Sequence, residues 1–206
     1  MKKMSFLFLL LFSVNVCGQN ILNGIGKIKL GMSFEEIREI VQPELTPRKH
    51  YWNVDEVRKF EVRKYEPIEG YYIENLEFSF YKNKLFMMES RGKTNIDEAL
   101  TIKYGNPKTT IEEEPVSFTN GFGAVITKKN RSSFMEWNTG NKDITCEFFH
   151  FSSYITVDGD IYPNVGTSFN LTDWKTKRIV QKLDEQNSTK AKREETEKLK
   201  KMVEGL

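Results

Sequence analysis

The chain has 206 residues, 31 basic and 29 acidic side chains, and a formal net charge of +2. Lys2 and Lys3 lie in a predicted leader; without them 29 basic side chains face 29 acidic ones, and the net charge is zero. A neutral chain has no overall attraction to nucleic acid or anionic lipid, so we expect no nucleic-acid partner. The length that remains suits one domain with a substantial core.

The first residues predict a secretory signal peptide over residues 1–18. Lys2 and Lys3 precede the apolar run Phe6–Phe12, and Gly18 stands at the expected cleavage site. The apolar run is far shorter than the roughly 20 residues that span a bilayer. We therefore expect an exported protein of bacterial type, periplasmic or secreted, whose mature chain begins after Gly18.

The two cysteines have different expected roles. Cys17 offers an alternative to simple export, because lipid attached to it would make the protein an outer-membrane lipoprotein. Val16, however, stands where a lipobox carries a small residue. If Cys17 leaves with the leader, Cys146 has no partner for an internal disulfide. The strand context of Cys146, between Ile144 and Phe148, predicts a buried and structural thiol.

A capping box begins the first predicted helix. Ser33 and Glu36 have the spacing at which each side chain bonds the backbone of the other, which predicts a helix at about 34–41. Farther on, the strand Leu76–Tyr81 and the run Leu85–Met88 predict a hairpin. Because the second run is apolar on both faces, we expect a central strand that is covered on both sides.

A second helix and a second set of strands follow. Asn95 is the predicted N-cap of a helix from Ile96 to Tyr104. The strand-like runs after this helix are short, and we place turns between them at Asn130–Arg131 and Ser152–Ser153.

The order of helix and then strands thus occurs twice, at about 32–90 and 95–160. It predicts an α+β fold in which two tandem helix–antiparallel-meander units form one domain over residues 19–170. Residues 171–206 are predicted to form a C-terminal, helical and charged tail.

The predicted tail is basic while the body is acidic. Residues 175–206 carry a net charge of +4, against −4 for the rest of the mature chain. The apolar residues near its end share one helical face: Leu199, Met202, Val203 and Leu206. The tail is interpreted either as a solvated helix or as an extension that binds a partner groove or a lipid surface. Membrane attachment is expected only through Cys17 or this tail.

No motif for catalysis, metal binding or a cofactor is found. His150 follows Cys146 by four strand positions, about 13 Å, which is too far for a catalytic dyad. Consecutive strand residues alternate faces, so Glu112–Glu114 do not converge. No Cys or His pair has the spacing of a zinc site. We therefore expect no catalytic residues, no metal and no cofactor; the alternative is a periplasmic or secreted hydrolase with an unrecognised carboxylate site.

Four aromatic residues are the candidates for a binding surface. They lie in irregular or strand-start positions among polar neighbours: Tyr51, Trp52, Tyr71 and Tyr72. Exposed aromatic side chains in such positions are typical of recognition surfaces, and the competing interpretation is that they belong to the core.

A leader followed by Lys29–Ile37 (KLGMSFEEI) and then by strands resembles the small envelope lipoproteins of the outer-membrane β-barrel assembly machinery. The doubled layout is also similar to that of β-lactamase inhibitor protein, although this chain lacks the disulfides of that family. Only the ending of the second helix, Tyr104–Pro107, approaches the helix ending of that family. The resemblance implies binding rather than catalysis. We therefore expect a non-enzymatic binding or assembly module of the bacterial cell envelope, which binds an envelope or secreted protein through a sheet face.

Overall fold

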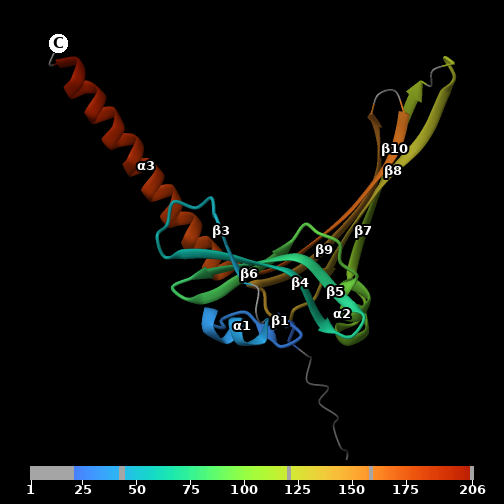
Figure 1. Ribbon diagram of the computed structural model, residues 1–206, viewed down its shortest axis with the longest axis horizontal. Helices are drawn as coiled ribbons and strands as arrows, with labels where there is room; N and C mark the ends of the chain where they lie inside the picture. Colours follow the sequence, from blue (N-terminus) through green and yellow to red (C-terminus); the bar gives the residue numbers. More distant parts are fainter. Residues whose placement is uncertain (1–20, 42–44, 120–121, 158–159, 205–206) are drawn as a thin grey trace, which may run out of the picture.

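The computed structural model describes residues 21–41, 45–119, 122–157 and 160–204; the predicted leader, with Cys17 and Gly18, lies outside them. The chain has an α+β fold (Figure 1). The strands are β1 (Gly24–Ile25), β2 (Ile28–Lys29), β3 (Thr46–Arg48), β4 (Val57–Ile68), β5 (Tyr71–Tyr81), β6 (Lys84–Ser90), β7 (Lys108–Thr119), β8 (Val125–Trp137), β9 (Ile144–Val157) and β10 (Asp160–Asp173). The helices are α1 (Phe34–Ile40), α2 (Ile96–Tyr104) and α3 (Trp174–Glu204).

Eight of the strands form one antiparallel sheet in the order β3-β4-β5-β6-β10-β9-β8-β7, while β1 and β2 pair only with each other. The first helix is followed by β3–β6 and the second by β7–β10, which confirms the predicted tandem of helix and meander. The two meanders join where β6 pairs with β10, for example Met88 opposite Leu171. Leu171 and Thr172 are therefore sheet residues, and the C-terminal helix begins at Trp174.

The two faces of the sheet are covered differently. On one face, α1, α2 and the β1–β2 hairpin pack on the main core, which includes Ile37, Leu100 and Phe78 (Figure 1). On the other face, called the α3 face below, the start of α3 brings Val180 against a smaller cluster that includes Met87. The strand β6 contributes to both clusters, and this confirms the prediction of a central strand covered on both sides.

Local hydrogen bonds explain the starts of the two short helices. The Ser33 side chain accepts from the Glu36 N–H and the Glu36 carboxylate accepts from the Ser33 N–H, so the predicted capping box is confirmed. Asn95 occupies the predicted N-cap position of α2, but its side chain makes no capping hydrogen bond. Its side chain instead joins α2 to β5, since it accepts from the Tyr72 N–H at 2.8 Å and donates to the Gly70 carbonyl at 2.9 Å.

The strands β7–β10 extend far beyond the helices and form an arm (residues 110–134 and 149–168, apart from 120–121 and 158–159) (Figure 1). The predicted turns at Asn130–Arg131 and Ser152–Ser153 are wrong, because these residues lie inside the continuous strands β8 and β9. Pairing between β8 and β9 ends at Arg131 opposite Ser152, so beyond this point the arm divides into two hairpins. At the division, the Asn130 side chain accepts from the Tyr154 N–H at 3.1 Å.

The C-terminal helix is attached to the body through its first four turns. Its Trp174 Nε1 donates to Thr145 at 2.9 Å, and Val180 is fully buried. Asp184 accepts from the Asn53 N–H, and the Asn187 side chain donates to the Asn53 carbonyl, both at 2.6 Å. Every described residue from 189 to 204 is exposed. No helix in the described part of the chain is long and apolar enough to cross a membrane.

Candidate interaction surface

The four aromatic residues singled out by the sequence lie at separate places. Trp52 is only 5% exposed and packs in the cluster beneath α3, whereas the neighbouring Tyr51 is 71% exposed. Tyr71 packs against the main core on the helix-covered face. The Tyr72 ring lies 4.8 Å from the Lys64 ammonium. The four therefore do not build one surface, and Tyr51 is the one that the fold leaves open.

Tyr51 borders a groove of about 480 Å³ on the α3 face of β4, β5 and β6. At its centre the Lys59 ammonium lies 2.7 Å from Glu77 and 2.6 Å from Glu89, on the two neighbouring strands. Cross-strand register explains this contact, since Lys59, Glu77 and Glu89 all point to the α3 face from adjacent strands. At the rim, Arg48 makes two hydrogen bonds to Glu61, at 2.6 and 3.1 Å. We call this the ionic groove.

Charge compensation in the ionic groove is internal. Burial by itself lowers the pKa of Lys59, but the hydrogen bonds to Glu77 and Glu89 outweigh it and the pKa is raised. The Lys59 ammonium is therefore held in its charged form and is shared by two carboxylates. Arg48 and Arg91 balance the remaining negative charge of the groove, which also contains Glu61. The pKa of Tyr51 is raised by partial desolvation and by the negative charge of Glu89, which keeps its phenol neutral. The groove offers a polar wall with one exposed aromatic ring.

A second region of the α3 face lies on the arm and is aromatic. In the register of the sheet, Phe134 on β8 faces Phe149 on β9, and one row farther out Ser132 faces Phe151. Residues directly opposite each other across antiparallel strands share a face of the sheet. Thr145 lies on the same side of β9 as Phe149 and Phe151, and its hydroxyl accepts the hydrogen bond from Trp174 at the start of α3. The rings therefore lie on the α3 face of the sheet.

The aromatic rings on the arm lie in the open. Phe134 is 37% exposed, and Phe149 and Phe151 are partly exposed with their ring centroids 6.0 Å apart. Figure 1 shows α3 and the arm rising on the same side of the sheet and diverging, so the helix does not cover these rings. Gly166 lies opposite Phe151 on β10, and an added Cβ there would stand 2.4 Å from the ring. The glycine thus leaves space for the ring to lie against the strand.

Two carboxylates lie beside the rings. Glu112 is opposite Ser132 and Glu114 is opposite Asn130, so both belong to the α3 face of β7, and all four residues line a hollow of about 410 Å³. Glu113 points to the other face, where it pairs with Lys129 at 3.2 Å, so the predicted alternation is confirmed. The prediction that these glutamates do not converge is wrong for Glu112 and Glu114, which share a face and line the same hollow. Within the described residues, neither Glu112 nor Glu114 has an ion-pair partner.

We call this region the arm patch, defined by Glu112, Glu114, Phe134, Phe149 and Phe151. The sequence did not indicate this region as a site. Phe149 and Phe151 stand two residues apart in a strand, a spacing that puts both rings on one face. Whether a helix covers that face depends on where α3 leaves the sheet. Open aromatic rings next to unpaired carboxylates can bind an apolar and basic segment of another molecule.

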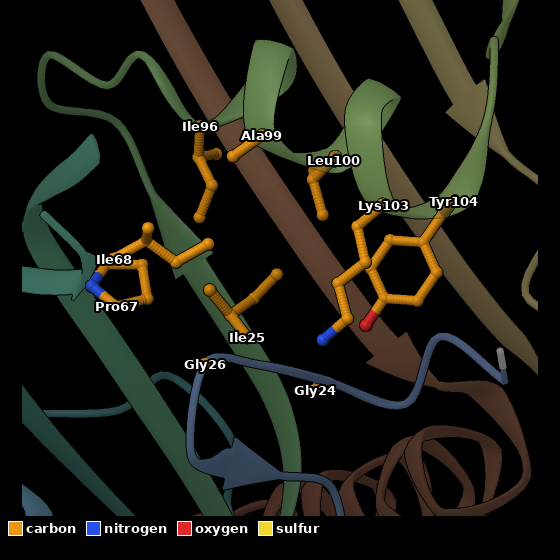
Figure 2. A pocket seen from close by; sticks show the side chains of 10 residues that line it. All are labelled: Gly24, Ile25, Gly26, Pro67, Ile68, Ile96, Ala99, Leu100, Lys103 and Tyr104. Atoms are coloured by element: carbon orange, nitrogen blue, oxygen red, sulfur yellow. The ribbon is translucent and has the colours of Figure 1, made fainter. Parts of the chain in front are cut away.

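A third hollow lies between the β1–β2 hairpin, the end of β4 and α2 (Figure 2). It is lined mainly by aliphatic side chains such as Ile25, Ile96 and Leu100 and has a volume of about 80 Å³. Figure 2 shows the Lys103 ammonium and the Tyr104 hydroxyl pointing toward the segment that holds Gly24. A space of this size holds one small aliphatic group.

Chemistry-bearing residues outside these regions do not assemble. Among the described residues, no group of three His, Cys, Asp or Glu side chains could hold a metal ion. Cys146 is fully buried, as the sequence predicted; desolvation and, to a lesser degree, the charge of Glu147 raise the pKa of its thiol far above the usual range. Such a thiol is neutral and unreactive at physiological pH.

Comparisons of the chain with protein-family models, with curated proteins and with solved structures find no match.

Proposed function

We propose that the protein is an exported, non-enzymatic binding module of the bacterial cell envelope, which holds a protein partner on the α3 face of its arm. The observation that carries the proposal is the arm patch: three phenylalanine rings and two carboxylates that, within the described residues, have no ion-pair partner and no covering element. Export is proposed from the leader at 1–18, and a role in the envelope from the resemblance of Lys29–Ile37 to envelope lipoproteins.

Aromatic rings that stay exposed to solvent do not contribute their burial energy to the stability of the fold. Burying apolar surface stabilises a protein by about 25 cal/mol per Å², so leaving several rings open on a projecting arm forgoes stability. A partner that covers Phe149 and Phe151 recovers this energy as binding energy. Glu112 and Glu114 beside the rings favour a partner segment that carries lysine or arginine, because opposite charges fix orientation and speed association.

The hydrolase alternative requires carboxylates that converge around a substrate. In the described part of the chain, Glu77 and Glu89 do converge, but on the Lys59 ammonium, which occupies the space between them. Ser79, opposite Lys59 on β5, is fully buried and out of reach of a substrate. The ionic groove therefore supports a structural or contact role better than acid–base catalysis.

Crosslinking in living cells tests the proposed function. A photoreactive amino acid replaces Ser132, which lies among the rings of the arm patch, or the adjacent Ser133, which points to the opposite face of β8. Both serines are partly exposed, so the two variants differ mainly in face. We expect protein adducts from position 132 and few from position 133. Equal adducts from both positions, or none from position 132, would overturn the proposal.

A further inference from the structure

Two surfaces of this molecule lack a covering partner, and their chemistry is complementary. One is the arm patch. The other is the outer half of α3, residues 189–204, where every side chain is exposed. Within it Leu199, Met202 and Val203 lie on one side of the helix at i, i+3 and i+4 spacing. The described structure buries neither the rings nor this aliphatic stripe.

The charges of the two surfaces are opposite and equal. Residues 189–204 contain six basic and four acidic side chains, a net charge of +2. The arm patch carries two carboxylates, Glu112 and Glu114, and no basic side chain among its five residues, a net charge of −2. Opposite net charges on two apolar surfaces favour their association and set its orientation.

The aliphatic stripe and the row of rings also have similar lengths. Leu199 to Val203 is four helical steps, roughly 6 Å at about 1.5 Å per residue. Phe149 to Phe151 is two strand steps, roughly 7 Å at about 3.3 Å per residue. One molecule cannot bring these surfaces together, because its own α3 is fixed at the base by Val180, Asp184 and Asn187 and diverges from the arm (Figure 1).

We propose that the outer half of α3 packs on the arm patch of a second copy of this chain, and that the second copy does the same in return. A two-fold dimer of this kind makes each contact twice and leaves neither surface open. The proposal names a partner for the surface on which the proposed function rests. The second copy and an envelope protein then compete for the arm patch, so the dimer is the resting state of the module.

A charge-swap series measured by light scattering after size-exclusion chromatography tests the dimer. Each of two double variants reverses the charge of one surface only. Glu112→Lys/Glu114→Lys changes the arm patch, and Lys198→Glu/Lys200→Glu changes the outer half of α3. All four side chains are exposed, so the fold should tolerate the changes, and circular dichroism checks this. We expect each pair alone to weaken dimerisation about tenfold or more, and the combination of both pairs to restore it.

A crosslink between different copies tests the contact itself. In a Cys17→Ser background the remaining native thiol is the buried Cys146, so introduced cysteines react selectively. Ser132→Cys protein is mixed with Met202→Cys protein and treated with a short bismaleimide. We expect a heterodimer, and Ser133→Cys, on the opposite face of β8, should give much less.

The results separate this inference from the proposed function. A wild-type protein that stays monomeric up to high micromolar concentration would overturn the dimer, as would binding of the monomer to phosphatidylglycerol vesicles through Leu199. If adducts to a different protein still form at position 132 in cells, the proposed function stands while the dimer fails. A dimer that survives both single-sided charge variants would also contradict the inference.

Discussion

The ring of Phe151 on β9 lies against Gly166 on β10, so closely that a Cβ on Gly166 would be 2.4 Å from two ring carbons. This contact packs an aromatic ring of one strand against the backbone of the next. The pairing of a strand glycine with an aromatic residue on the next strand is a known way to compensate for the missing side chain. In this protein it also determines the shape of the arm patch.

Replacing Gly166 by Ala should therefore displace the Phe151 ring. We expect a loss of about 1–2 kcal/mol in the free energy of unfolding, because an overpacked site must shift a ring or the backbone. Urea denaturation measures the change. Ser168→Ala, two residues along β10 on the same face, is the matched control and should change stability by less than about 0.5 kcal/mol. Equal stability of Gly166→Ala and wild type would show that the ring moves freely.

Lys59→Met should destabilise the protein by about 2–4 kcal/mol at neutral pH, because Glu77 and Glu89 lose the ammonium that they share. The exposed Lys64, replaced by Met, is the control and should have a much smaller effect. Denaturation curves from pH 6 to 11 measure both variants.

The same substitution has a defined pH dependence. The pKa of Lys59 in the folded protein is raised above 10.5, the value for the unfolded chain. Its contribution to stability is therefore fully present below about pH 10.5 and is lost as the pH rises through the higher folded pKa. The difference between wild type and Lys59→Met should be constant from pH 6 to 9.5 and should decrease above pH 10.5. A difference that already falls between pH 7 and 9 would contradict the raised pKa.

Cys146 should react slowly with a thiol reagent at pH 7.5 in the folded protein and rapidly in 8 M urea, about the concentration that unfolds most domains. The reason is burial, which removes the thiol from solvent and keeps it protonated. Cys17→Ser protein isolates the signal from this one thiol. Rapid labelling of the folded protein would show that β9 opens at this position.

Truncation after Ser188 should leave the melting temperature of the monomer within about 2 °C of wild type, because residues 189–204 bury nothing in the described structure. Truncation after Asp184 should lower it further, since it removes the bond between the Asn187 side chain and the Asn53 carbonyl. Dilute samples, in which a dimer dissociates, are needed for this comparison. A large drop in melting temperature after truncation at Ser188 would show that the outer half of α3 packs on the body of its own molecule.

Mass spectrometry of the protein from its host should give an N-terminus at Gln19, as the leader predicts. A mature chain that begins at Cys17 and carries acyl groups would instead make the protein a membrane-anchored lipoprotein.

Three features of the fold followed from residues that are close together in the sequence. The capping box of Ser33 and Glu36 involves only neighbouring residues, and the structure confirms it. The central position of β6 followed from apolar residues on both faces. Cys146 was placed in the core because its strand neighbours are apolar. In each case the residues that decided the prediction lie within a few positions of one another in the chain.

The length of the strands in the arm and the exposure of the arm patch were decided by contacts between distant segments. The sequence placed turns at Asn130–Arg131 and Ser152–Ser153, because polar residues with turn propensity outweigh strand propensity over a short window. In the folded chain these residues pair across β7–β9, and the cross-strand hydrogen bonds make β8 and β9 continuous. Whether α3 covers the rings of the arm patch was decided by its departure from the sheet at Trp174. The arm patch exists because that helix diverges from β9, a relationship between segments that no local pattern encodes.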